Sequence, residues 1–164
     1  MHIFITGGRG VGKSTLIKNA LRSLNVTPSG FVTEWEGDTL YIRPADRSSS
    51  GKPVAVRLEG KGREVYREAF DVYGTALIRA SAGAELILMD ELGFMESSAE
   101  EFRRAVMEVL DGHTPILGAL REHDSDFLSS IAEHPNVELI TLTVENRDEM
   151  PAFLETRLRQ ILKI

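Results

Sequence analysis

The segment that most constrains this chain is residues 7–14, which read Gly-Gly-Arg-Gly-Val-Gly-Lys-Ser and fit the pattern G-x-x-x-x-G-K-[ST]. An apolar run at residues 3–5 precedes this segment. The residues after it place apolar side chains at the spacing of an amphipathic helix, at Leu16, Ile17, Ala20, Leu21 and Leu24. A buried strand, a glycine-rich loop and a helix in this order direct backbone N–H groups at one anion. The sequence therefore predicts a phosphate-binding loop between a first strand and a first helix.

The residue types within this loop indicate separate tasks. Four glycines in six positions leave the backbone amides open to a phosphate group. Lys13 supplies a mobile positive charge to the β- and γ-phosphates, and the Ser14 hydroxyl is placed to coordinate Mg²⁺. The predicted nucleotide-binding residues of the loop are Gly7, Gly8, Arg9, Gly10, Val11, Gly12, Lys13, Ser14 and Thr15. The alternative, an ordinary glycine-rich turn with a surface lysine, requires the strand and the helix to flank the motif by coincidence.

A pair of acids ends the second apolar segment of the chain. Residues 86–89 are apolar throughout, as in a strand buried on both faces, and Asp90 and Glu91 follow them. Ligands of open α/β sheets bind at the carboxyl ends of the strands. We therefore expect Asp90 to hold Mg²⁺ directly or through water, and Glu91 to orient or deprotonate an attacking water molecule. A helix N-cap or a solvated strand end is the alternative for this pair.

Three further residues extend the predicted site. Residues 116–120 form another apolar segment, which ends at Arg121. If this strand neighbours the first strand, Arg121 can reach the γ-phosphate as an arginine finger, a task for which Arg9 is the other candidate. Asn146 and Arg147 follow a last strand-like segment at residues 138–144 and are candidates to frame the base. A helix N-cap at Asn146 or at Asp148 is the competing interpretation.

Two amphipathic helices are predicted in the second half of the chain. Ser98 and Glu101 fit a capping box, while Glu96 either joins the acidic cluster or lies in solvent. The first of these helices is expected to bury Phe102, Ala105, Val106, Val109 and Leu110. The second, at the end of the chain, is expected to direct inward Met150, Phe153, Leu154, Leu158, Ile161 and Leu162.

Residues 43–67 combine the loop-like sequence Ser-Ser-Ser-Gly-Lys-Pro with five arginines, which are Arg43, Arg47, Arg57, Arg63 and Arg67. One interpretation is a solvated β-hairpin with a flexible turn. The other is a mobile flap that closes arginines over a triphosphate or a second substrate. The sequence leaves both open.

Composition narrows the class of protein. The chain has 164 residues, a net charge of −6 and no cysteine. The length predicts one domain, and the acidic balance argues against nucleic acid as a general partner. The lack of cysteine excludes disulfides and cysteine-based metal sites, and no apolar stretch approaches the ~20 residues of a membrane span. We expect a cytoplasmic protein, favoured as a monomer, with no membrane partner.

The order of these segments predicts the fold class. Buried strands near Ile3, Leu86, Ile116 and Leu139 alternate with amphipathic helices. Such alternation predicts an α/β protein with three α/β/α layers around a mostly parallel sheet. Residues 31–58 add an antiparallel β-hairpin insertion, and another strand is expected between the acid-pair strand and the first strand.

Four blocks of the sequence, taken together, resemble the small nucleoside-triphosphatase family of P-loop NTPases. They are Thr-Gly-Gly-Arg-Gly-Val-Gly-Lys-Ser-Thr at 6–15, Ser-Gly-Phe-Val-Thr-Glu at 29–34, Met-Asp-Glu-Leu-Gly-Phe-Met-Glu at 89–96 and Thr-Val-Glu-Asn-Arg-Asp at 143–148. The block at 89–96, which contains the acid pair, and the Asn-Arg-Asp block within 143–148 carry the specificity of this resemblance, because many families share the phosphate loop. The resemblance implies the P-loop NTPase fold and slow Mg²⁺-dependent hydrolysis of several nucleoside triphosphates, with Glu91 as the water-activating residue.

Three activities follow from these residues. Hydrolysis of ATP, GTP and other nucleoside triphosphates to diphosphate and phosphate accounts best for Glu91. A kinase would transfer the γ-phosphoryl group to a nucleoside, nucleotide or nucleic-acid acceptor, with Asp90 or Glu34 accepting a proton and the arginine-rich segment binding the acceptor. A nucleotide-controlled binding module is the third alternative, although residues 146–149 only approximate the Asn-Lys-x-Asp motif that guanine-binding switches usually show.

Overall fold

A single eight-stranded sheet organises the computed structural model, which describes residues 1–60, 62–93, 99–122 and 125–164. Its strands are β1 (His2–Thr6), β2 (Ser29–Glu36), β3 (Thr39–Pro44), β4 (Lys52–Leu58), β5 (Gly62–Val65), β6 (Ile87–Leu92), β7 (Ile116–Leu120) and β8 (Val137–Thr141). They lie in the order β5-β4-β3-β2-β6-β7-β1-β8. Five of these strands, from β2 to β8 in that order, pair in parallel.

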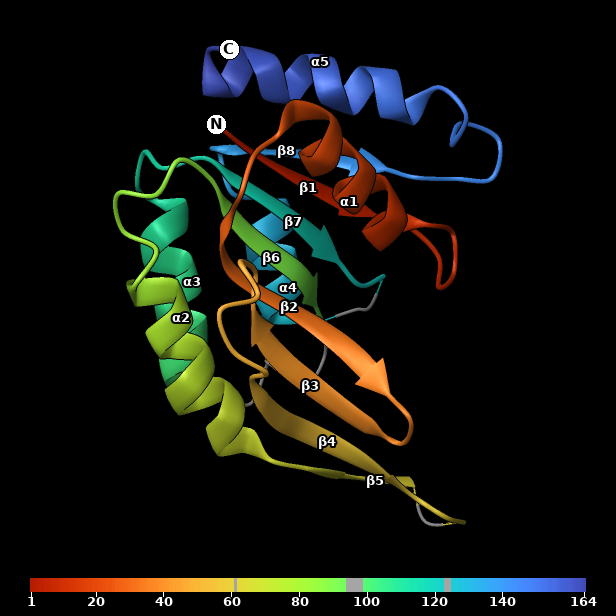
Figure 1. Cartoon of the computed structure of the whole chain (residues 1–164), viewed down its shortest axis with the longest axis vertical. Helices are drawn as coiled ribbons and strands as arrows, with labels where there is room; N and C mark the ends of the chain where they lie inside the picture. Colours follow the sequence, from red (N-terminus) through yellow and green to blue (C-terminus); the bar gives the residue numbers. More distant parts are fainter. Residues whose placement is uncertain (61, 94–98, 123–124) are drawn as a thin grey trace.

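Helices cover both faces of the sheet (Figure 1). Helices α1 (Lys13–Leu24) and α5 (Met150–Leu162) pack on one face. On the other face lie a π-helical turn η1 (Ala69–Gly74), α2 (Thr75–Arg79), α3 (Glu100–Leu110) and α4 (Asp126–Ala132). The α/β/α layers and the mostly parallel sheet predicted from the sequence are therefore confirmed.

The parallel core places the two predicted motifs at one edge of the sheet. Strand β7 lies between β6 and β1, with Leu117 opposite both Ile3 and Leu88. The prediction that one strand separates the acid pair from the phosphate-loop strand is correct. Close packing supports this arrangement, because a Cβ atom at Gly118 would lie 2.2 Å from the ring of Phe4. Parallel strands end at the same edge, so the loops after β1, β6 and β7 meet there.

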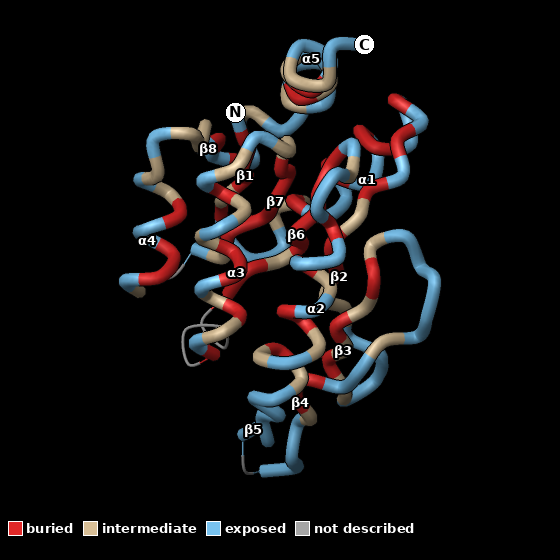
Figure 2. Tube along the Cα trace, turned by 90° about the vertical axis from the view of Figure 1, so that its left-hand side faces the viewer, coloured by how far each residue is buried: buried red, intermediate tan, exposed pale blue. Residues whose placement is uncertain are grey.

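The antiparallel insertion is longer than the predicted hairpin. Strand β2 pairs with β6 on one side and with β3 on the other, where the chain turns into a meander that continues through β4 to β5. These strands extend the sheet instead of standing apart from it. Burial falls along this extension, from the buried centre at β6 and β7 to the fully exposed β5 (Figure 2).

Most predicted helix faces are correct, with one clear exception. All five apolar residues predicted inward in α1 are buried. Helix α3 buries four of its five, and Val109 is half-buried. In α5, Leu154 and Leu158 are buried but Phe153 is 44% exposed, so its predicted inward position is wrong. Helix α5 rests on a single neighbouring layer, and its buried stripe is narrower than its apolar stripe.

In the described part of the chain, no helix combines the length and the apolar character that a membrane span requires. The cytoplasmic location and the monomeric state expected from the sequence stay predictions. Glu96, Ser98 and His123 lie outside the described residues, so the predictions for the first two are not resolved by the structure.

Candidate functional site

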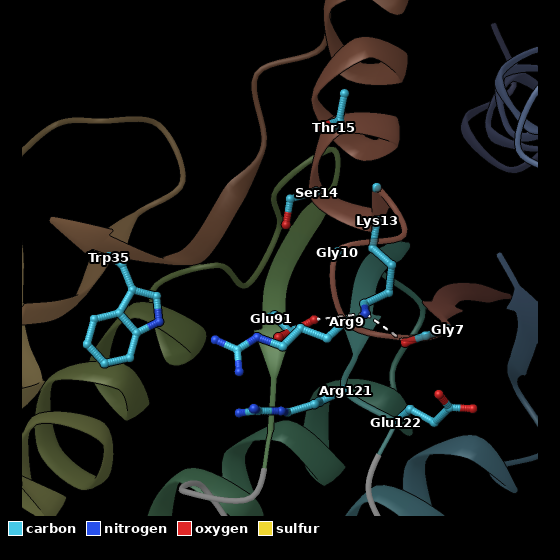
Figure 3. A pocket seen from close by; sticks show the side chains of 11 residues that line it. Gly7, Arg9, Gly10, Lys13, Ser14, Thr15, Trp35, Glu91, Arg121 and Glu122 are labelled. Atoms are coloured by element: carbon cyan, nitrogen blue, oxygen red, sulfur yellow. Dashed lines mark hydrogen bonds and ion pairs between the residues drawn. The ribbon is translucent and has the colours of Figure 1, made fainter. Parts of the chain in front are cut away.

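Residues from the β1–α1 loop, the start of α1, β2, β6 and the segment after β7 converge on a hollow of about 570 Å³ (Figure 3). Predicted site residues line most of it, namely Gly7, Arg9, Gly10, Gly12, Lys13, Ser14, Thr15, Glu91 and Arg121. Sequence reasoning did not assign Trp35 and Glu122, which line the same hollow. The structure thus brings together segments separated by more than one hundred residues.

Backbone geometry explains why glycines stand at both ends of the phosphate loop. Gly7 has a φ of +148°, and a Cβ atom there would lie 2.4 Å from the carbonyl oxygen of Leu142. Gly12 has a φ of +110° and occupies the N-cap of α1. L-residues with a side chain rarely adopt such angles. Between these glycines the chain makes a tight turn, in which the N–H of Val11 donates to the carbonyl of Gly8 at 3.2 Å.

Lys13 folds back over this loop. Its Nζ donates to the carbonyl oxygen of Gly7 at 2.9 Å and to that of Gly8 at 3.4 Å, and only 7% of the residue is exposed. The same ammonium group lies 3.4 Å from Oε2 of Glu91. The ammonium group of Lys13 therefore connects the phosphate loop to Glu91 of β6.

Asp90 lies beneath the loop and contacts Ser14. The Ser14 Oγ donates to Oδ1 of Asp90 at 3.0 Å, and Asp90 is only 4% exposed. Burial raises the pKa of Asp90 to about 6, an effect that the hydrogen bond from Ser14 opposes and the negative charge of Glu91 adds to. A carboxylate and a hydroxyl at this distance match the oxygen ligands that Mg²⁺ takes beside substrate phosphates.

Thr33 of the neighbouring strand holds the backbone between the two acids. Its Oγ1 accepts a hydrogen bond from the N–H of Glu91 at 3.1 Å and donates to the carbonyl of Asp90 at 3.5 Å. The Glu91 side chain remains one-third exposed and faces the hollow. Strand β2 carries no catalytic motif, but through Thr33 it holds the peptide group that joins Asp90 to Glu91.

Two arginines line the hollow opposite the acids. Strand β7 neighbours β1, which is the condition for Arg121 to approach the phosphates, and the N–H of Arg121 donates to the carbonyl of Leu92 at 2.8 Å. Arg9 reaches the hollow from the phosphate loop. In Figure 3 both guanidinium groups extend past Glu91 toward the side on which Trp35 lies.

A smaller hollow of about 360 Å³ adjoins the other side of the phosphate loop. Gly8, Val11, Val144 and Arg147 are among its lining residues. Asn146 is not among them, and its side chain holds the loop after β8. Its Oδ1 accepts from the N–H of Thr143 at 2.8 Å, and its Nδ2 donates to the carbonyl of Thr141 at 2.8 Å.

The N-cap of α5 is neither of the two residues that the competing interpretation of this segment names. Glu149 occupies that position and Pro151 follows in the first turn, so neither Asn146 nor Asp148 caps the helix. The Asn146 amide instead closes a local turn with the backbone of Thr143.

The arginine-rich segment runs from the end of β3 through β4 and β5, and four of its five arginines fall into two groups. Arg43 and Arg47 form ion pairs with Glu34, and Arg43 also pairs with Glu36. Arg57 and Arg63 lie over the ring of Trp35, at 4.0 Å and 5.9 Å from its centroid. The backbone of this segment forms antiparallel strands, as the hairpin interpretation expects. Arg57 and Arg63, however, lie over Trp35, which lines the site. No local pattern in the sequence indicates that Trp35 and Arg63 meet, because β2 and β5 are joined only through two intervening strands.

The comparisons with known proteins agree with this geometry. A family described as NTPase matches residues 2–38 and 54–154 of the chain. The nucleoside-triphosphatase THEP1 of Thermofilum pendens is 32% identical, covering 98% of this chain and 97% of the relative. The protein of the same name from Methanocaldococcus jannaschii is also 32% identical, covering 92% of each chain.

Solved structures show the same fold. The crystal structure of THEP1 from the hyperthermophile Aquifex aeolicus superposes with a TM-score of 0.80 at 28% identity, covering 96% of this chain and 99% of that one. The solution structure of a human cancer-related nucleoside triphosphatase gives a TM-score of 0.76 at 25% identity, covering 97% of each chain. The chain therefore belongs to the NTPase family of enzymes that hydrolyse nucleoside triphosphates.

Proposed function

We propose that the hollow after β1 binds a nucleoside triphosphate together with Mg²⁺ and hydrolyses it to the diphosphate and phosphate. The position of Glu91 carries this proposal. Its carboxylate lies 3.4 Å from the ammonium group of Lys13, whereas the neighbouring Asp90 is bonded to Ser14. An acid beside the phosphate-binding lysine that is not engaged with Ser14 is suited to act on a water molecule.

The phosphate loop is the expected binding site for the triphosphate. Loop residues from Gly7 to Ser14 line the hollow except Gly8 and Val11, and α1 begins at Lys13, so its positive N-terminal end faces the same space. Lys13 would exchange its two carbonyl partners for oxygens of the β- and γ-phosphates. That exchange favours binding because a charged phosphate is a stronger acceptor than a carbonyl group.

Ser14 and Asp90 are the residues that would hold Mg²⁺. Both supply oxygen ligands, and Mg²⁺ is commonly held by one or two protein oxygens plus substrate phosphates and water. When bound, the ion supplies positive charge that neutralises the β- and γ-phosphates. A positive ion would also favour the ionised form of the Asp90 carboxylate, whose pKa burial otherwise raises to about 6.

Glu91 is proposed as the residue that activates water. When Lys13 moves to the phosphates, it leaves the carboxylate of Glu91, which can then accept a proton from water. The water oxygen bonds to the γ-phosphorus while the bond to the β–γ bridging oxygen breaks, and the diphosphate leaves with that electron pair. Thr33 positions Glu91 for this step through its hydrogen bond to the Glu91 N–H.

Arg121 and Arg9 are proposed to stabilise the charge that develops on the transferring group. Both line the hollow, and a guanidinium group can donate two hydrogen bonds to one phosphate. Arg121 is the stronger candidate because it directly follows the buried strand β7, whereas Arg9 lies within the phosphate loop.

The smaller hollow beside the loop is the proposed site of the base. Val144 and Arg147 line it and offer an apolar surface and a planar cation for a stacked ring. Asn146 contributes indirectly, by holding the loop that carries both residues. ATP and GTP are both expected substrates.

Release of labelled phosphate from γ-labelled ATP and GTP tests this proposal. Activity should require Mg²⁺ and disappear with a chelator. Glu91→Gln should lower turnover by about 10²–10³-fold, since it removes the proton acceptor. The matched control is Glu122→Gln, because Glu122 is the other acid lining the same hollow, and its turnover should stay within about twofold of wild type. Equal losses in both variants, or activity without Mg²⁺, would refute the assignment.

A further inference from the structure

A second hollow of about 220 Å³ adjoins the catalytic one on the side of the antiparallel extension. Glu91, Arg9 and Arg121 line both hollows, as do Ser14 and Trp35. Thr33 and Arg63 line only the second. The second space shares the Glu91 side chain with the catalytic hollow, so a ligand in it would lie beside the acid at which the attacking group is expected.

The lining of the second hollow is strongly positive. Among the described residues that line it, Arg9, Arg63 and Arg121 contribute three guanidinium groups and Glu91 contributes one carboxylate. The chain as a whole has a net charge of −6, so this concentration runs against its overall balance. Guanidinium groups match the planar, two-point geometry of a phosphate oxygen pair. The charge therefore selects a phosphate-bearing ligand.

Trp35 keeps Arg63 near this hollow. The Trp35 ring comes from β2 and Arg63 from β5, at the free edge of the extension. The guanidinium carbon of Arg63 lies 5.9 Å from the ring centroid, within the range of a cation–π interaction. Figure 3 shows Trp35 across the hollow from Arg9 and Arg121. Positive charge thus reaches the hollow from the extension as well as from the catalytic loops.

We propose that the second hollow binds the phosphate group of a nucleoside monophosphate, which accepts the γ-phosphoryl group in place of water. This inference rests on the proposed function, because the donor triphosphate occupies the phosphate loop. The phosphate of the monophosphate contacts Arg63 and Arg121, and its sugar and base extend along Trp35 toward solvent. Trp35 is 37% exposed, so part of its surface is open to such contact.

The transfer step balances without a proton acceptor. An oxygen of the monophosphate bonds to the γ-phosphorus while the bond to the β–γ bridging oxygen breaks, and two diphosphates result. A phosphate dianion needs no deprotonation, so Glu91 has no required task in transfer. Glu91→Gln should therefore reduce hydrolysis far more than transfer, which separates the two reactions within one site.

The tryptophan supplies a direct binding assay. Trp35 is the only tryptophan in the sequence, so its fluorescence reports on this hollow. We would add AMP, GMP, CMP or UMP to the protein loaded with Mg²⁺ and a nucleoside diphosphate. The proposal predicts a saturable fluorescence change. Arg63→Gln should weaken binding about tenfold, the loss expected for one charge-assisted contact.

Arg57→Gln is the matched control. Arg57 also lies over Trp35 but does not line the hollow. It should leave the affinity for the monophosphate within about twofold of wild type, because a surface arginine without contact to the ligand contributes little. Equal losses of affinity in Arg57→Gln and Arg63→Gln would indicate a general effect on the Trp35 ring and would overturn the proposed contact.

Transfer is measured in parallel with γ-labelled ATP. Labelled diphosphate formed from the monophosphate, and reduced in Arg63→Gln, supports the proposal. Binding without transfer, or a fluorescence response to inorganic phosphate but not to monophosphates, overturns it. Phosphate release without acceptor is recorded in the same samples. If that release is normal, only this inference fails; if it is absent, the proposed hydrolysis fails as well.

Discussion

Strands β6 and β5 both bring charged residues to the site, but their surroundings differ. Strand β6 lies in the parallel core, is almost wholly buried and carries Asp90 and Glu91. Strand β5 lies at the free edge of the antiparallel extension, is exposed throughout and carries Arg63. The parallel core thus supplies the chemistry through fixed, buried positions, whereas the extension adds charge from a surface that can change without unfolding the core.

The largest expected effect on hydrolysis distinguishes a lysine of the parallel core from a lysine of the antiparallel extension. Lys13→Ala should lower hydrolysis by at least about 10²-fold, because it removes the charge that faces the β- and γ-phosphates. Lys52→Ala in β4 of the extension is the control and should stay within about twofold of wild type. Steady-state phosphate release measures both. A comparable loss of hydrolysis in Lys52→Ala would contradict the assignment of the chemistry to the parallel core.

Two glycines, one in the parallel core and one in the extension, test whether the two regions also differ in their contribution to the free energy of unfolding. Gly30 in the β2–β6 pair has a φ of +97°, and a Cβ atom there would lie 2.1 Å from the carbonyl oxygen of Leu88. Gly30→Ala should lower the free energy of unfolding by about 3 kcal/mol or more. Gly37 in the β2–β3 turn has a φ of +60° with nothing near its Cβ position, so Gly37→Ala should lower it by only about 1 kcal/mol. Urea unfolding compares the two, and equal losses would contradict the packing difference.

Asp90 is expected to reduce the stability of the nucleotide-free protein. The pKa of this buried carboxyl is raised from 3.8 to about 6, so the folded state binds more protons than the unfolded state between these values. The free energy of unfolding should therefore fall as pH rises from about 4 to about 6. Without Mg²⁺ at pH 7.5, Asp90→Asn should be about 2 kcal/mol more stable than wild type and should lose hydrolysis. A stability gain that persists below pH 4 would contradict this origin.

Glu34 in the extension should behave in the opposite sense. Hydrogen bonds from Arg47 and Arg43 lower its pKa from 4.5 to about 2. Its contribution is present above pH 4.5 and is lost as pH falls toward 2, so Glu34→Gln should lower the free energy of unfolding by about 1 kcal/mol at pH 7. Glu36→Gln is the control, because that side chain is 67% exposed and pairs with one arginine. Thermal unfolding at several pH values measures both, and a Glu34 effect unchanged at pH 2 would contradict the ion-pair account.

The parallel core was largely predictable from the sequence. The phosphate loop and the acid pair are local motifs, and each stands beside an apolar strand that can only be buried. Parallel strands share a carboxyl edge, so Lys13, Glu91 and Arg121 meet without further information. The expected strand between β6 and β1 is also present, although that expectation rested on analogy, since a shared carboxyl edge does not specify the order of the strands.

The extension was less predictable because its contacts depend on register. Trp35 and Arg63 meet only through the successive pairings of β2, β3, β4 and β5, and a one-residue slip would reverse the faces. Phe153 shows a similar limit, since an apolar spacing does not specify how wide a face the neighbouring layer covers. Asn146 shows another, because a side chain that bonds its own loop has the same residue type as one that contacts a base.

Single-turnover kinetics of Glu91→Gln, with nucleotide affinity measured on the same samples, separates a role of Glu91 in activating water from a role in binding the nucleotide. If Glu91 activates water in the core site, the rate of γ-phosphate release should fall by at least about 10²-fold while the dissociation constant for Mg²⁺–ATP stays within about threefold. An unchanged rate would contradict the role of Glu91. A loss of binding that matches the loss of rate would show instead that Glu91 holds the nucleotide.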